Sequence, residues 1–215
     1  MPVVTIARLY GAGGDSVGKM VAARLKADFV GPELIDEVAH RLELPKEEVA
    51  AADEQPGSFL NRLLIALAAA SPEHAATSES PTWTPPYSDP HSDPRRAVLE
   101  FTQQVIREAA HSGNVVIVGR GGAYILAGLE GALHVFLRAG ESERVKVVME
   151  REQITQDEAR RRMKQTDENR RAYIRQVYGH TWDLPGHYDL VLDTGRLGYD
   201  ATVEAILAAL QGRTK

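Results

Sequence analysis

The sequence predicts an α/β domain with three layers, in which helices cover both faces of a parallel sheet. Three apolar runs rich in β-branched or large apolar residues, typical of buried strands, occur at 3–7, 115–118 and 133–137. Segments with helical spacing of apolar residues lie between and after these runs. Strands that alternate with helices in this way favour a parallel sheet.

The elements follow in a regular order along the chain. The expected strands are 3–7, 27–30, 115–118, 133–137 and 190–192. The expected helices are 19–25, 32–42, 94–112, 122–127, 142–152, 155–177 and 199–211. Residues 45–52 are polar and also favour a helix.

Composition excludes several classes of protein. The 215 residues carry a formal net charge of −5 and a sequence pI near 5.8, which argues against a nucleic-acid or anionic-membrane partner. The absence of Cys excludes disulfides, thiolate zinc sites and cysteine nucleophiles. The chain opens on a strand without a secretory signal, and the most apolar segment, 59–70, is too short to span a bilayer. We therefore expect a cytoplasmic protein.

A glycine-rich loop with phosphate-binding spacing follows the first strand. Residues 11–19 read GAGGDSVGK, in which Gly13, Gly18 and Lys19 fit the pattern G-x-x-x-x-G-K. Glycines let backbone N–H groups turn toward phosphate oxygens, and the following helix offers its positive end. The alternative is a glycine-rich turn that binds nothing. The residues expected around the phosphates of ATP are Gly11, Ala12, Gly13, Gly14, Asp15, Ser16, Val17, Gly18, Lys19 and Met20.

Lys19 would open the helix and reach the β- and γ-phosphates as a mobile positive charge. The pattern normally continues with Ser or Thr, whose hydroxyl binds Mg²⁺, but this chain has Met20. Because a thioether serves a hard cation poorly, Mg²⁺ would be held mainly by phosphate oxygens and water, and we predict no metal-ligating residue.

The middle of the chain has a different character. Segment 58–70 is apolar around most of its circumference, so it is either buried or paired with a second subunit in a homodimer. Residues 71–94 are rich in Pro, Ser and Thr and cannot sustain a helix or a ladder. This loop either docks through Trp83 and Tyr87 or is a mobile surface loop.

Two segments rich in arginine are predicted to lie near the glycine loop. Arg120 directly follows the strand 115–118, and ligands of parallel sheets bind beyond the carboxyl ends of the strands. This side chain either binds a phosphate bidentately or lies on the surface beside a turn. The helix 155–177 carries more cations at 159–175 than its neighbouring acids can pair. It is either a lid that closes over a triphosphate or a solvated helix face.

Taken together, these motifs resemble the cytidylate kinase-like family, relatives of the P-loop nucleoside monophosphate kinases. The resemblance covers most of the chain. It is carried by TIARLYGAGG from residue 5, FVGPELI from 29, IVGRGGAYIL from 117, VFL from 135, ESERVKVVMERE from 141, DENRRAY from 167 and YDLVLDTGRLG from 188.

The resemblance implies a P-loop kinase fold of about five parallel strands in a single domain 1–215, with an acceptor-side region at 31–94 and a lid at 155–178. It also implies phosphoryl transfer from ATP, with Mg²⁺, to CMP or dCMP. Lys19, Arg162 and Arg170 would then be catalytic. Arg8, Arg120, Lys164 and Asp167 would contact the substrates, and the loop 193–197 would lie near the donor base.

Three positions depart from the family pattern. Gly31, Val118 and Gly121 stand where cytidylate kinases usually carry Asp, so the residues support acceptor selection and metal handling least. Two alternatives therefore remain beside the nucleotide kinase. One is a nucleotide-binding regulator of the same fold that transfers nothing, and the other is a kinase for another small acceptor, such as a sugar or a cofactor precursor.

Overall fold

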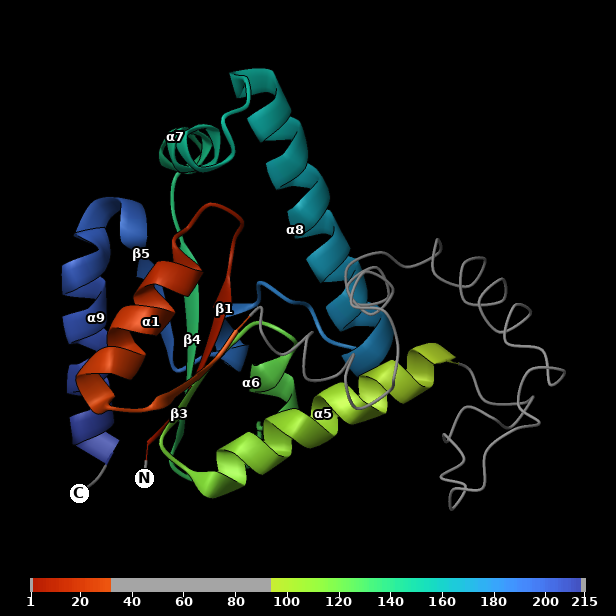
Figure 1. Cartoon of the computed structure of the whole chain (residues 1–215), viewed down its shortest axis with the longest axis vertical. Helices are drawn as coiled ribbons and strands as arrows, with labels where there is room; N and C mark the ends of the chain where they lie inside the picture. Colours follow the sequence, from red (N-terminus) through yellow and green to blue (C-terminus); the bar gives the residue numbers. More distant parts are fainter. Residues whose placement is uncertain (1, 32–93, 214–215) are drawn as a thin grey trace, which may run out of the picture. The chain divides into compact units, whose positions relative to one another are not determined.

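The structure is a computed structural model that describes residues 2–31 and 94–213 (Figure 1). The chain divides into two units, one of residues 1–32 with 105–215 and the other of residues 33–104. The predicted helices 32–42 and 45–52 and the apolar segment behind the homodimer alternative lie outside the described residues, as does the loop 71–94 up to residue 93. Everything below concerns the first unit unless stated otherwise.

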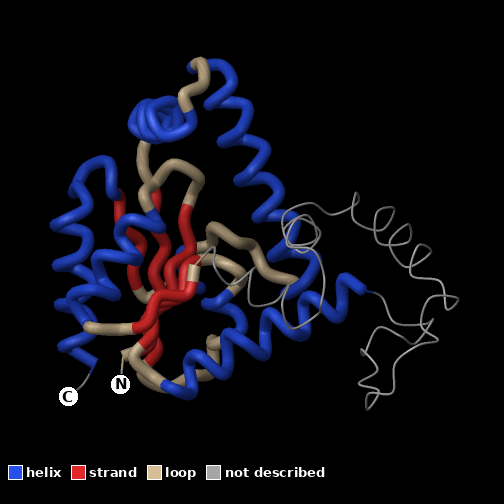
Figure 2. The backbone as a smooth tube through the Cα atoms, in the orientation of Figure 1, coloured by secondary structure: helices blue, strands red, loops and turns tan. Residues whose placement is uncertain are grey.

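Five parallel strands form one sheet in the order β2-β3-β1-β4-β5 (Figure 2). The strands are β1 (Val3–Arg8), β2 (Asp28–Val30), β3 (Val115–Val118), β4 (Ala132–Arg138) and β5 (Leu190–Asp193). Strand β1 is central, and Ile6 pairs in register with Val118 on one side and with Val135 on the other. The predicted α/β class and the sheet of about five parallel strands are confirmed.

Helices cover both faces of this sheet. The described helices are α1 (Gly14–Leu25), α5 (Pro94–Ser112), α6 (Gly122–Ile125), α7 (Glu141–Glu152), α8 (Gln156–Tyr178) and α9 (Thr194–Arg213), with a 3-10 turn, η2 (Pro185–His187). Helices α1 and α9 pack on the face that carries Ile6, Val118 and Val135. Because successive side chains of a strand alternate between faces, Thr5 and Ile117 point to the other side, where α6 lies.

The core explains why the strands are apolar throughout. Val3 to Ile6 of β1 and all four residues of β3 are buried, since both faces of these central strands are covered. The layer under α1 and α9 contains Val17, Val21, Leu133, Leu137 and Ile206. On the opposite face Phe136 packs edge-on against the buried Trp182, with ring centroids 5.5 Å apart.

One helix start differs from the sequence prediction. Helix α1 begins at Gly14 and not at Lys19. The span α9 joins two helical pieces across the non-helical Gly198, and the predicted helix from residue 199 corresponds to its second piece. Helix α8 begins beside Thr155, as predicted, through a capping box in which Thr155 and Glu158 satisfy each other's backbone N–H groups. Among the described residues, no helix combines the length and apolar character needed to cross a membrane.

Helix α7 and the first half of α8 form a separate small layer beyond the carboxyl ends of the strands, and α8 then continues beside the sheet, where Ile174 packs in one cluster with Phe136 (Figure 1). Val145 and Val148 of α7 pack against Ala159 and Met163 of α8, and the ring of Tyr10 joins this cluster from the loop after β1. The predicted lid segment 155–178 thus coincides with one helix whose first half rests on α7. Its closure over a ligand stays a prediction.

Candidate functional site

The loop between β1 and α1 has the backbone of an anion-binding turn. Gly11 and Gly13 adopt left-handed conformations, with φ of +80° and +73°, and Gly13 forms the N-cap of α1. A Cβ atom at Gly13 would also lie 2.4 Å from the ring of Tyr199, so only glycine fits there. Gly13 has no side chain to cap the first N–H groups of α1, and an uncapped helix start of this kind suits an anion.

The structure places the Gly18–Lys19 pair inside α1 and away from this loop. A Cβ atom at Gly18 would lie 2.6 Å from Val118 Cγ2, so this glycine allows close packing of α1 on the sheet. Lys19 is exposed, with its Nζ atom 5.5 Å from the ring centroid of Phe29. The prediction that Lys19 opens the helix is therefore wrong, because four residues from Gly14 onward complete the first turn before it.

The other predicted loop residues divide between the helix start and the core. Ala12, Gly13, Gly14, Asp15 and Ser16 lie in the turn or the first turn of α1. Val17 is fully buried in the core, and the half-buried Met20 packs against the same cluster. The Met20 side chain therefore helps to anchor α1. It does not occupy the first helical positions, where the hydroxyl of a phosphate loop lies.

Arg8 extends from the end of β1 between two glycine turns. A Cβ atom at Gly14 would lie 2.5 Å from Arg8 Cγ, and a Cβ atom at Gly119 would lie 2.2 Å from Arg8 Nη1. The Arg8 side chain thus extends from the start of α1 toward the turn after β3, and its guanidinium lies beside Gly119. Its Nη2 atom lies 3.6 Å from a carboxylate oxygen of Asp15, and 19% of the Arg8 side chain is exposed.

Arg120 stands at the same end of the neighbouring strand. It follows β3 in a turn where Gly119, Arg120 and Gly121 all have positive φ, and the N–H of Gly119 donates to the carbonyl of Ile6. Burial, followed by the positive charge of Arg8, lowers the pKa of Arg120 to about 10. The side chain therefore stays protonated at neutral pH, and its positive charge lies close to that of Arg8.

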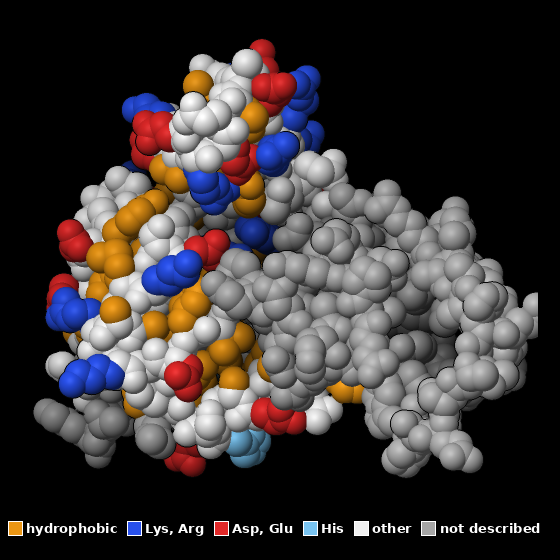
Figure 3. Space-filling view, viewed as in Figure 1, with side chains coloured by type: hydrophobic (Ala, Val, Ile, Leu, Met, Phe, Trp, Pro, Cys, Tyr) orange, Lys and Arg blue, Asp and Glu red, His pale blue; other side chains and the backbone are white. Residues whose placement is uncertain are grey.

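Arg170 brings a third cation to the same place from α8. Its Nη1 atom donates a 3.0 Å hydrogen bond to the backbone carbonyl of Arg8, and its guanidinium lies 5.5 Å from the ring centroid of Tyr10. Figure 3 shows Lys and Arg side chains, interspersed with Asp and Glu, at the α7–α8 end of the molecule. The structure thus brings together Arg8, Arg120 and Arg170 from three separate segments.

Asp167 is buried and hydrogen-bonded within the protein, whereas a residue that contacts substrate is usually exposed. Its carboxylate is buried and accepts hydrogen bonds from the N–H of Tyr10 at 2.8 Å and from Arg144 Nη1 at 2.7 Å. The same Arg144 atom donates to the carbonyl of Tyr10 at 3.2 Å. Asp167 and Arg144 thereby tie α8 and α7 to the loop, and the predicted contact of Asp167 with substrate stays untested.

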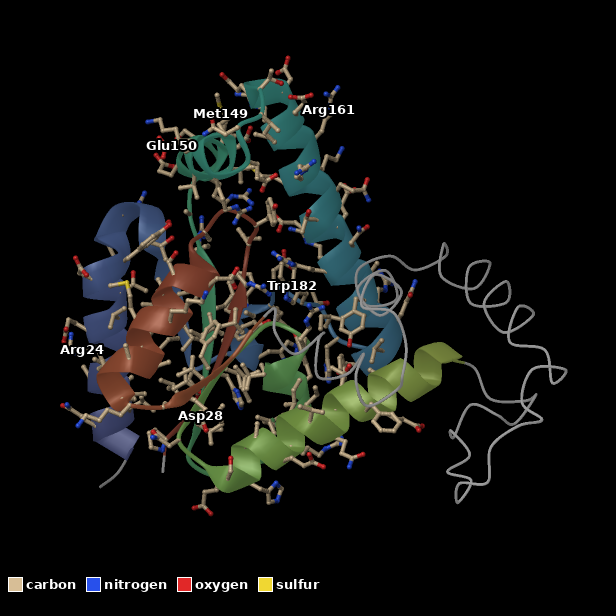
Figure 4. All side chains as sticks on the ribbon, viewed as in Figure 1. Arg24, Asp28, Met149, Glu150, Arg161 and Trp182 are labelled. Carbon is tan, nitrogen blue, oxygen red and sulfur yellow. The ribbon has the colours of Figure 1, made fainter. Side chains whose placement is uncertain are left out.

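Arg162 and Lys164 lie nearer the start of α8 than Arg170 does. Arg162 is 55% exposed and pairs with Glu152 at 2.5 Å, while Lys164 is 79% exposed and lies 4.0 Å from Glu168. Burial alone would raise the pKa of Glu152, but hydrogen bonds from Tyr10, Arg151 and Arg162 hold it below its usual value. Figure 4 shows the neighbouring Arg161 at the end of α8 that is distant from the sheet, whereas Trp182 lies close to the sheet.

Sequence reasoning missed Tyr10 and Arg144 as parts of the site. The main chain of Tyr10 is held by Asp167 and Arg144, and its hydroxyl donates to Glu152. Arg144 had one available signal, since it follows β4 closely and so lies beyond the carboxyl end of a parallel strand. For Tyr10, the sequence offered no signal beyond the position of this residue in the loop.

Comparisons with known proteins agree on the kind of fold and on the family. The chain is 35% identical over 112 residues to the cytidylate kinase of Methanopyrus kandleri, and 27% identical over 110 residues to that of Methanocaldococcus jannaschii. These alignments cover 48% and 50% of this chain. They cover 58% and 62% of the two relatives, so the chain spans less than two thirds of the length of either.

Solved structures support the architecture. An uncharacterized protein from Eubacterium ventriosum superimposes with a TM-score of 0.70 at 20% identity, over 99% of this chain and 100% of that one. The shikimate kinase of Bacteroides thetaiotaomicron superimposes with a TM-score of 0.51 at 15% identity, over 97% of each chain. At these identities the likeness concerns the fold alone. The model of the cytidylate kinase-like family matches residues 3–196, and the chain therefore belongs to that family.

Proposed function

We propose that this protein is a nucleoside monophosphate kinase-like phosphotransferase that transfers a phosphoryl group from ATP to CMP or dCMP. The observation that carries the proposal is that Arg8, Arg120 and Arg170 gather beside the end of β1, which leads through the glycine loop into the uncapped start of α1. A cationic site built on backbone N–H groups suits a polyphosphate. Membership of the cytidylate kinase-like family and the cytidylate kinases among its relatives support the choice of acceptor.

The proposed reaction is a direct displacement. A phosphate oxygen of the acceptor nucleotide attacks the γ-phosphorus of ATP, the bond from that phosphorus to the bridging oxygen breaks, and ADP leaves. The transferring group carries spread negative charge, so a positioned cation contributes by neutralising it. Arg170 is the cation with the best placement for this task, because its helix packs over the loop and its side chain already reaches Arg8.

The residues at the helix start fit a magnesium ion held chiefly by the nucleotide. Among the described residues, no group of three or more His, Asp or Glu side chains could hold a metal. Asp15 nevertheless places one carboxylate in the first turn of α1, and oxygen ligands of this kind suit Mg²⁺ together with phosphate oxygens and water. When bound, the ion would neutralise part of the phosphate charge.

A coupled assay of ADP release tests the function. Wild-type protein with ATP and Mg²⁺ is offered each nucleoside monophosphate, and we expect turnover with CMP or dCMP. The variant Arg120→Ala serves as the control for contaminating kinases, because it should lose the activity while a contaminant would persist. Turnover confined to a sugar or cofactor precursor would contradict the nucleotide acceptor and point to another kinase.

A nucleotide-binding regulator is the second candidate, and one observation favours it. Gly14 begins α1 where phosphate loops carry their lysine, so the helix start lacks a catalytic side chain of its own. The two candidates differ in a single measurement. A regulator would bind ATP in calorimetry but would release no ADP with any acceptor, whereas a kinase would do both.

Lys19→Ala is expected to change ATP affinity and turnover by less than about twofold, as for an exposed surface substitution away from the ligand. The physical reason is that its ammonium lies beside Phe29, in the second turn of α1. Isothermal titration with ATP and the ADP-release assay measure both quantities. A loss of ATP affinity above tenfold would show that Lys19 contacts the phosphates.

A further inference from the structure

The helix start shifts the phosphate-loop pattern along the chain. Because α1 begins at Gly14, residues 8–15 stand where the pattern G-x-x-x-x-G-K-[ST] belongs between a strand and a helix. The second glycine of the pattern is then Gly13. Its lysine position is held by Gly14, its hydroxyl position by Asp15, and its first glycine position by Arg8. The positive charge is thus present but stands at the other end of the loop.

Arg8 and any long side chain at position 14 exclude each other. A Cβ atom at Gly14 would lie 2.5 Å from Cγ, 3.0 Å from Cβ and 3.1 Å from Cδ of Arg8. The backbone of Gly14 is ordinary right-handed helix, which any residue can adopt, so its φ does not require glycine. The stem of Arg8 is therefore the reason for glycine here. The fold accommodates one long cation in this place, either from the strand end or from the helix start.

We propose that Arg8 binds the β- and γ-phosphates of the donor nucleotide in place of the missing loop lysine. This inference rests on the proposed function, because it assigns a residue to the donor site. The stem of Arg8 passes the start of α1, whose first N–H groups have no side-chain cap, and its guanidinium lies beside the Gly119 turn. A planar guanidinium gives two parallel hydrogen bonds to a phosphate, which an ammonium cannot do.

The ion pair with Asp15 does not by itself account for this placement. The two side chains are 3.6 Å apart at their charged atoms, and the Asp15 side chain is 44% exposed, so the pair is weak. Arg8 also lies close enough to Arg120 for its positive charge to lower the pKa of Arg120. A polyphosphate would neutralise the positive charges of both Arg8 and Arg120. Asp15 would then turn toward the solvent or toward a bound Mg²⁺.

Isothermal titration with ATP and with AMP tests the proposal in three variants. Arg8→Met keeps the length of the stem without its charge, and we expect ATP affinity to fall about 30-fold, which corresponds to a lost pair of charge-assisted hydrogen bonds. AMP has no β- or γ-phosphate, so its affinity should change by less than about threefold. The swap Arg8→Gly with Gly14→Lys moves the cation to the usual place, and it should recover ATP affinity to within about tenfold of wild type.

Gly14→Lys alone is the matched control for the steric argument. With Arg8 still present, the added side chain has no room, so the melting temperature should fall well below that of the swap variant. Equal melting temperatures of the two would overturn the mutual exclusion. Should Arg8→Met fail to fold, the folded swap variant decides, since its failure to bind ATP would contradict the proposal.

The outcomes separate the two proposals. Wild-type protein that binds ATP while Arg8→Met binds it equally well would overturn the assignment of Arg8 and leave the kinase function standing. Wild-type protein that binds neither ATP nor AMP would overturn the proposed function together with this inference.

Discussion

Replacing Arg170 with alanine is expected to lower turnover about 1,000-fold, the effect of removing an arginine that neutralises a transferring phosphoryl group. Affinity for ATP should fall less than about tenfold, because the contact with the γ-phosphate would strengthen mainly in the transition state. The structural reason is the reach of Arg170 from α8 to the carbonyl of Arg8 at the start of the loop. Steady-state ADP release and isothermal titration measure the two effects separately.

Arg162→Ala is the matched control for this prediction. Both arginines lie on α8, but Arg162 is 55% exposed and pairs with Glu152. Its replacement should change turnover by less than about threefold, as for an exposed surface ion pair. Equal losses in the two variants would show that α8 rearranges on ligand binding and brings both residues to the phosphates. A normal rate in both would make α8 an ordinary solvated helix.

Asp167→Ala is expected to lower the free energy of unfolding by about 3 kcal/mol, because it leaves the half-buried guanidinium of Arg144 without its carboxylate. It also removes the acceptor of the Tyr10 N–H, so the loop loses its link to α8. For a domain of this size, the loss corresponds to a fall in melting temperature of about 10 °C. Thermal unfolding followed by circular dichroism measures it.

Glu168→Ala separates this effect from a general loss of negative charge. Glu168 is the next residue of α8, but it is half-exposed and its partner Lys164 lies 4.0 Å away. The melting temperature of this variant should stay within about 2 °C of wild type, as for a weak surface pair. A melting temperature for Asp167→Ala as high as that of Glu168→Ala would show that Asp167 does not hold the loop. Its predicted role in substrate binding would then gain weight.

The sequence by itself determined the class of fold and the order of its elements. Runs such as Val115–Val118 are apolar at every position, because a central parallel strand is covered on both faces, and no other common element has this pattern at such short length. It also located the glycine turns at the ends of β1 and β3. Those turns need positive φ, which the clustering of glycine reveals directly.

Only the tertiary structure decided which residues of these turns meet. Both Gly13-Gly14 and Gly18-Lys19 were compatible with a helix start, and the choice depends on how closely α1 packs on the sheet, which Gly18 permits against Val118. The same holds along α8, where spacing alone made Arg162 and Arg170 equivalent. The packing of α7 against α8 places Arg170 against the carbonyl of Arg8 and Arg162 against Glu152. Position relative to another element depends on long-range contacts that no local pattern contains.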